Sequence, residues 1–226
     1  MKKSLFFLLF LQLVTIRDSA AVTLFQDNFN SYANSAAFHQ AILNGSSGWE
    51  AVRFQAPADG SILSDIGVSN LIPFGQGQFA VFADNAGIMF QVSTEGLTEA
   101  MLSFDWRTVA ADYTDYFAAG YFVGDLPTDS DHTTSFVANG NPWWHTDWTS
   151  IVYSRSTASR SIVDYLLPVG EASLWIAFWY NDRSCDRIGV GLLDNVRVTG
   201  SEVPEPATAM LLGSALVAFR LRRRRG

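Results

Sequence analysis

The sequence is poor in the residues that most often build metal sites and covalent cross-links. Its 226 residues include one cysteine, Cys185, and three histidines, His39, His132 and His145, which are far apart in the chain. A single cysteine excludes an internal disulfide framework and leaves Cys185 either a small buried hydrophobic residue or a partner in an intermolecular disulfide. The sequence also has no zinc-type Cys/His spacing, no HExxH segment, no Gly-x-Ser-x-Gly turn and no phosphate-binding glycine loop.

Lysine is almost absent, since it occurs only at Lys2 and Lys3. Residues 22–205 hold 21 acidic side chains and 7 arginines, which gives this part of the chain a net charge of −14. Nucleic-acid phosphates are bound through lysine and arginine, and a surface this acidic repels them. Nucleic acid is therefore excluded as a partner.

The N-terminal end carries one of the two long uncharged runs of the chain. Two lysines precede an apolar stretch from Leu5 to Val14, and small residues follow at Ser19, Ala20 and Ala21. This order is typical of a secretory signal peptide. A membrane helix, the alternative, needs a longer apolar run. The sequence predicts a signal peptide over 1–21 that signal peptidase removes.

The C-terminal end has three parts. The linker 201–206 contains Pro204, Glu205 and Pro206, and its prolines stop a strand or a helix from continuing. Residues 207–221 follow as a hydrophobic segment, which spans a bilayer as a short helix only if its arginines extend to the interface. The basic tail 222–226 holds Arg222, Arg223, Arg224 and Arg225, which the positive-inside rule keeps cytoplasmic.

The Pro-Glu-Pro motif, the apolar segment and the arginine run together resemble the PEP-CTERM sorting signal. The resemblance covers about the last 24 residues. It implies recognition, and cleavage near the motif, by an exosortase-type enzyme of a Gram-negative bacterium that makes exopolysaccharide. The implied location is the cell envelope, the cell surface or the extracellular matrix, with anchoring in the inner membrane before processing. A plain tail anchor is the alternative.

Residues 22–200 show short alternating runs separated by Gly, Asp, Asn and Pro. One short helix is expected at Ser35–Leu43. Strands are expected at Val22–Phe29, Trp49–Phe54, Gln78–Ala83, Gly87–Ser93, Ala100–Arg107, Tyr116–Val123, Ser150–Ser154, Ser161–Leu166, Ser173–Tyr180 and Gly189–Val198. Many short strands with turn residues between them predict a single all-β domain, a two-sheet antiparallel sandwich of the jelly-roll type.

Alternation within the strands predicts which side chains face the core. Leu102, Phe104 and Trp106 share one face of their strand and are expected in the core. In Ser173–Tyr180 both faces are apolar, which is typical of a central strand covered on both sides. Asp194 falls on the apolar face of the last strand, where a carboxylate needs a partner or a metal unless a bulge turns it outward.

Three short segments resemble concanavalin-like and carbohydrate-binding-module-like jelly rolls. They are Asp27-Asn28-Phe29, Leu102-Ser103-Phe104-Asp105-Trp106 and Leu193-Asp194-Asn195-Val196-Arg197-Val198. In such domains the two ends of the chain commonly lie adjacent, with a structural calcium ion near them. The resemblance implies Asp27 and Asp194 as calcium ligands, and calcium is the one cofactor expected. The alternative is that hydrogen bonds to these residues fix the terminal strands.

The segment 139–148 holds three tryptophans within six residues, Trp143, Trp144 and Trp148, in a loop-like run of Asn, Gly and Pro. Flat aromatic rings beside His145 and Asp147 suit a sugar ring, which offers apolar faces and hydroxyl rims. This pattern predicts a carbohydrate contact, with exopolysaccharide as the candidate ligand. Alternatively the tryptophans fill the end of the sandwich. Trp148 begins a strand and is expected in the core.

Catalysis is not expected. A jelly-roll glycosidase needs two carboxyl groups roughly 5 to 9 Å apart, which on one strand face requires an i, i+2 pair. No expected strand carries such a pair, and Asp112 and Asp115 have the wrong spacing. The sequence predicts a non-catalytic sandwich, structural or adhesive, in an exopolysaccharide or biofilm setting. A carbohydrate-binding module with a Trp-rich loop site is the first alternative, and a jelly-roll glycosidase or lyase is the second.

Overall fold

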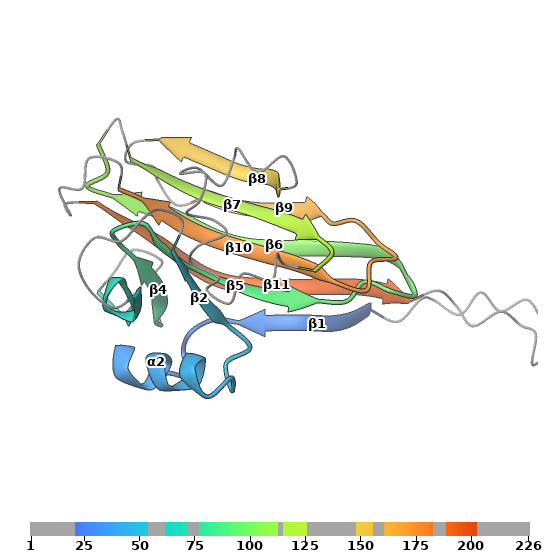
Figure 1. Cartoon of the computed structure of the whole chain (residues 1–226), viewed down its shortest axis with the longest axis horizontal. Helices are drawn as coiled ribbons and strands as arrows, with labels where there is room; N and C mark the ends of the chain where they lie inside the picture. Colours follow the sequence, from blue (N-terminus) through green and yellow to red (C-terminus); the bar gives the residue numbers. More distant parts are fainter. Residues whose placement is uncertain are drawn as a thin grey trace, which may run out of the picture.

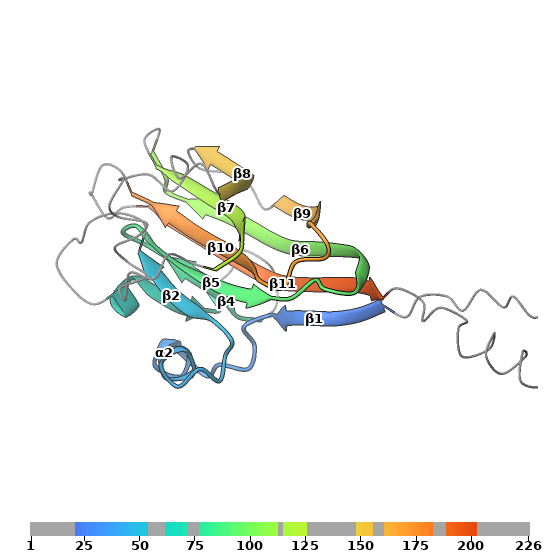
Figure 2. The same cartoon turned by 45° about the vertical axis from the view of Figure 1, so that its right-hand side comes forward.

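A computed structural model describes residues 21–53, 62–71, 77–112, 115–125, 148–155, 161–182 and 189–202. Within these ranges the chain forms one α-helix, one 3-10 helix and eleven β-strands (Figures 1 and 2). The predicted signal peptide, hydrophobic segment and basic tail lie outside the described residues. In the described part of the chain, no helix is both long and apolar enough to span a bilayer.

The strands form two antiparallel sheets, as the sequence predicts. Sheet A consists of β1 (Ala21–Asp27), β3 (Ile66–Ser69), β4 (Phe79–Phe82), β6 (Leu97–Val109), β9 (Ser161–Leu166) and β11 (Val190–Glu202). Its order is β3-β4-β11-β6-β9, and β1 also pairs with β11. Sheet B consists of β2 (Glu50–Arg53), β5 (Ala86–Val92), β7 (Tyr116–Val123), β8 (Trp148–Arg155) and β10 (Leu174–Asn181), in the order β2-β5-β10-β7-β8. The all-β sandwich is therefore confirmed.

The short helix α2 has the predicted bounds, Ser35–Leu43. The side chain of Asn34 caps it by accepting a hydrogen bond from the amide of Ala37 at 3.0 Å. Phe38 is its buried residue. The 3-10 helix Ile62–Asp65 and the strand β3 were not predicted from the sequence.

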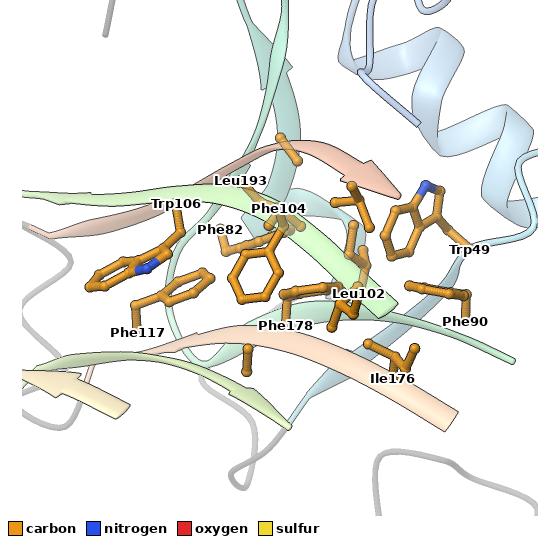
Figure 3. Close-up of a cluster of buried hydrophobic side chains, with 14 of the residues drawn as sticks. Trp49, Phe82, Phe90, Leu102, Phe104, Trp106, Phe117, Ile176, Phe178 and Leu193 are labelled. Carbon is orange, nitrogen blue, oxygen red and sulfur yellow. The ribbon is translucent and has the colours of Figure 1, made fainter. Parts of the chain in front are cut away.

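Aromatic side chains from both sheets fill the space between them (Figure 3). Phe104 on β6 meets Phe178 on β10 with ring centroids 4.9 Å apart. Trp106 stacks on Phe117 of β7, with ring centroids 5.1 Å apart and an angle of 4° between the ring planes. Leu102 is also buried in this core, so the predicted core face of β6 is confirmed.

A bulge in β11 decides where Asp194 points. The register between β11 and β6 shifts between Asp194 and Arg197, and Asn195 has a φ of 51°. After the bulge Val196 faces the core. Before it, Asp194 lies opposite Asp105 of β6, on the outer face of sheet A. Asp194 therefore does not share the face of Val196, because a bulge turns it outward.

The first and last strands lie side by side in sheet A (Figure 1). Ala21, the first residue of β1, pairs with Ser201 near the end of β11. The described chain therefore enters and leaves the sandwich at the same end.

Candidate functional site

The outer face of sheet B, which points away from the core, carries a second cluster of apolar side chains. In β10 the core-facing residues are Leu174, Ile176, Phe178 and Tyr180. The intervening Ala177 and Trp179 belong to the outer cluster, with Trp175 packed against it. The prediction of a central strand covered on both sides is confirmed, since β10 is the middle strand of sheet B and Ala177 and Trp179 are as fully buried as Phe178. The outer cluster is itself buried, and partly exposed aromatic side chains such as Trp175 pack beside it.

Four side chains form a row across this outer face. Gln91 of β5 lies opposite Trp175 of β10, Trp175 lies opposite Phe122 of β7, and Phe122 lies opposite Trp148 of β8. We call these four residues the aromatic row. Gln91 is exposed and the three aromatic residues are partly exposed. Since neighbouring strands lie about 4.8 Å apart, the row extends roughly 14 Å across the sheet.

Two rings of the aromatic row contact each other. The centroids of Phe122 and Trp148 are 5.9 Å apart, with the ring planes at 32°. Trp148 in turn meets the buried Trp179 edge to face at 6.5 Å. Such contacts fix ring orientation, so the exposed parts of these rings form a preorganised surface.

Small residues form the floor beside the aromatic row. Gly120 lies opposite Ala177, and Gly87 lies opposite Trp179. A Cβ at Gly120 would lie 2.8 Å from the carbonyl oxygen of Thr149 on β8. The strands therefore approach closely only because these positions lack a side chain.

Polar groups border the row at one side. The amide of Gln91 donates a hydrogen bond from Nε2 to Oγ of Ser173 at 2.7 Å. The hydroxyl of Ser173 donates to the carbonyl oxygen of Gly124 at 2.8 Å. Gln91 is therefore held in one orientation, and the row combines flat apolar rings with an oriented amide.

The predicted sugar-contact residues Trp143, Trp144, His145 and Asp147 lie outside the described residues, as do Pro204, Glu205, Pro206 and Arg222 to Arg225. Trp148 begins β8 as expected, and it packs, partly buried, against the second buried cluster, on the outer face of sheet B. The aromatic row could not be predicted from the sequence, because its members come from four strands whose register no local pattern reveals.

Both carboxylate oxygens of Asp27 accept hydrogen bonds from within the protein. Its Oδ1 accepts a hydrogen bond from the amide of Phe29 at 2.6 Å. Its Oδ2 accepts from the hydroxyl of Tyr32 and from Nε1 of Trp49, both at 2.8 Å. These hydrogen bonds connect the end of β1 to the segment that precedes α2 and to Trp49, the residue before β2.

Asp194 has different surroundings. It lies opposite Asp105, and Nδ2 of Asn195 donates to Oδ2 of Asp105 at 2.9 Å and to Oδ2 of Asp194 at 3.4 Å. Asp27 pairs with Val196 and so faces the core, whereas Asp194 faces outward, so the structure does not bring the two together. Among the described residues, no three Asp, Glu, His or Cys side chains form a group suited to a metal. Calcium binding stays a prediction.

A buried carboxyl group lies at the end of the sandwich where β7 begins. Asp115 is only 1% exposed, and Oδ2 accepts hydrogen bonds from the hydroxyl of Tyr180 at 2.8 Å and from the amide of Asp112 at 3.2 Å. Burial raises the pKa of the Asp115 carboxyl above its ordinary value; the hydrogen bond from Tyr180 lowers it in part, and the charges of Asp182 and Asp112 raise it further.

We expect Asp115→Asn to stabilise the protein at neutral pH. When the folded-state pKa of a carboxyl group is raised, the group lowers the stability of the folded protein at high pH. This loss develops as the pH rises from the unfolded-state pKa, about 4, through the folded-state pKa. Asparagine keeps an oxygen for Tyr180 and removes the charge. Urea midpoints of the variant and the wild type should agree best near pH 4 and separate toward pH 7, and a variant less stable at pH 7 would contradict this.

The C-terminal part of the chain matches the PEP-CTERM protein-sorting motif over residues 202–225. This confirms the predicted sorting signal. The motif marks the chain for export and for anchoring at the membrane or the surface through an exosortase. The match begins at Glu202, the last residue of β11. No curated protein sequence matches the chain.

Solved structures similar to the sandwich include carbohydrate-binding modules. The CBM22-1 xylan-binding domain of Paenibacillus barcinonensis Xyn10C has 12% identity and a TM-score of 0.45, covering 82% of this chain and 99% of that one. The K3 adhesin domain of Lys-gingipain from Porphyromonas gingivalis has 12% identity and a TM-score of 0.46, covering 80% and 99%. The fold of the present chain is defined by its own strand order and register.

Proposed function

We propose that the protein is an exported, exosortase-sorted adhesive module that binds polysaccharide without cleaving it. The observation that carries the proposal is the aromatic row, Gln91, Trp175, Phe122 and Trp148, on the outer face of sheet B. Partly exposed aromatic rings lie in register across three neighbouring strands, beside the buried cluster of the outer face and apart from the core between the sheets. They mark a binding surface.

A polysaccharide fits this surface chemically. Sugar rings present apolar C–H faces that pack on flat aromatic rings, and their hydroxyl groups pair with a fixed amide such as that of Gln91. A polar and largely acidic body without lysine disfavours anionic polymers that need basic side chains. The proposed ligand is therefore a neutral polysaccharide in the extracellular matrix, where the sorting signal delivers the chain.

The carboxyl groups of the sandwich support a non-catalytic role. Glycosidases need two carboxyl groups open to the substrate, roughly 5 to 9 Å apart. Asp105 and Asp194 lie opposite each other but are only 4% and 6% exposed. Asp115 and Asp182 are buried in the same way. Neither pair lies on the outer face of sheet B, where the aromatic row is.

The test is a binding experiment on a panel of neutral and acidic polysaccharides, with and without calcium. We expect Trp175→Ala combined with Trp148→Ala to weaken binding by about 30-fold or more, the scale of losing a central aromatic contact. Ile162→Ala, at an exposed position of β9 in sheet A, is the control and should bind like the wild type. Circular dichroism and unfolding midpoints establish that each variant is folded.

A second double variant, Trp143→Ala with Trp144→Ala, separates the two candidate sites. Loss of binding in this variant alone would place the contact in the Trp-rich loop and reject the aromatic row. Binding by neither the wild type nor any variant, under both calcium conditions, would reject carbohydrate binding and leave a structural envelope protein.

A further inference from the structure

The sorting signal joins the folded sandwich with almost no linker. The matched motif begins at Glu202, which is still part of the 13-residue strand β11. Only Val203 separates this strand from Pro204. The two Cα–Cα steps from Glu202 to Pro204 span at most about 7 Å, so the Pro-Glu-Pro segment begins within that distance of the end of β11.

The end of β11 is held by β6. Ser201 pairs with Glu99 and Glu202 pairs with Leu97, whereas Ala21, the β1 partner of Ser201, belongs to the predicted signal peptide. The hydroxyl of Thr98 adds a hydrogen bond to the carbonyl oxygen of Ser201 at 3.0 Å. The main-chain groups of these residues are therefore occupied within sheet A.

An enzyme that reads an extended peptide uses the same main-chain groups that a sheet uses. The matched motif begins at Glu202, and this same residue pairs with Leu97 of β6. The register irregularity between Ser201 and Glu202 weakens the pairing at this point. The ends of strands open more readily than their centres, which makes this the place where the sandwich yields.

We propose that the last residues of β11, Ser201 and Glu202, are part of the recognition site for the membrane-bound sorting enzyme. They bind to it only after they leave β6. The fraction of molecules with an open strand end then sets the apparent affinity for the enzyme. This inference rests on the sorting motif and is independent of the proposed polysaccharide ligand.

A reversible staple tests this step in the full chain. Glu99→Cys with Ser201→Cys places two cysteines at directly paired positions of β6 and β11, in a Cys185→Ser background. The control staple, Ser103→Cys with Asp164→Cys, joins a directly paired position of β6 and β9 and leaves the end of β11 unrestrained. Each protein is prepared in an oxidised and a reduced form and incubated with membranes of a bacterium that processes the wild-type tail. Tail removal is followed by mass spectrometry.

We expect the oxidised Glu99/Ser201 staple to be processed at least tenfold more slowly than the same protein after reduction. The control staple should be processed equally in both states. Thr98→Ala, which removes the bond to Ser201, should speed processing by roughly two- to fivefold. Equal rates for the oxidised and reduced Glu99/Ser201 protein would overturn the proposal. Equal processing of the wild type and of a Glu205→Ala variant would overturn its premise that the Pro-Glu-Pro motif is read.

Discussion

Replacing Gly87 by alanine is expected to destabilise the protein by about 3 kcal/mol, although it adds a single methyl group. Gly87 lies in β5 opposite Trp179 of β10, at the centre of sheet B. A Cβ there would collide with the carbonyl oxygen of Phe178 and lie 2.8 Å from Cα of Trp179. These are backbone atoms of the central strand, so relief requires the two strands to separate.

Urea denaturation followed by tryptophan fluorescence measures this loss. Gly45→Ala is the matched control, since a Cβ at Gly45 meets no atom within 4 Å and only the φ of 72° opposes it. That conformation costs alanine about 1 kcal/mol. A Gly87→Ala variant no less stable than Gly45→Ala would contradict the close approach of β5 and β10.

Asp27→Ala is expected to cost about 3 kcal/mol, because it leaves three donors without their acceptor. The amide of Phe29, the hydroxyl of Tyr32 and Nε1 of Trp49 all donate to this carboxylate. Trp49 and Phe29 are fully buried or nearly so, and their rings stack with centroids 5.8 Å apart. An unsatisfied indole N–H would therefore remain inside the core.

Tyr32 provides a second readout of the same variant. Burial, and then the charge of Asp27, raise the pKa of the Tyr32 phenol above its ordinary value. Removing the carboxylate should lower this pKa, which an ultraviolet titration of the phenol measures. Asp164→Ala is the control, since its bond to Ser103 is exposed and its loss should change stability by less than about 0.5 kcal/mol. An unchanged Tyr32 pKa in Asp27→Ala would contradict the contact.

Residue patterns within single segments predicted the helix and the core-facing side chains of individual strands. The helix Ser35–Leu43 follows from its composition, and the alternation of Leu102, Phe104 and Trp106 gives the core face of β6. The alternation in β10 also shows that Trp175 and Trp179 lie on the face opposite to Phe178.

Properties that depend on strand register were out of reach. The aromatic row exists because Trp175, Phe122 and Trp148 come into line from three strands, and nothing near Trp148 in the sequence shows this. The bulge at Asn195 reverses the alternation of β11, so the face of Asp194 follows from one residue's backbone conformation. Trp143 and Trp144 of the Trp-rich loop lie outside the described residues, so a sugar contact there stays a prediction.

The position of β11 in sheet A bears on how the chain folds after export. This strand lies between β6 on one side and β4 and β1 on the other, yet it is the last of the eleven to be synthesised. A chain that crosses the membrane from its N-terminus exposes β1 first, and β1 has no partner in its sheet until β11 arrives. Contacts this distant in sequence form slowly. We expect the polypeptide to remain unfolded throughout translocation, so that sheet A closes only when the segment beside the sorting signal emerges.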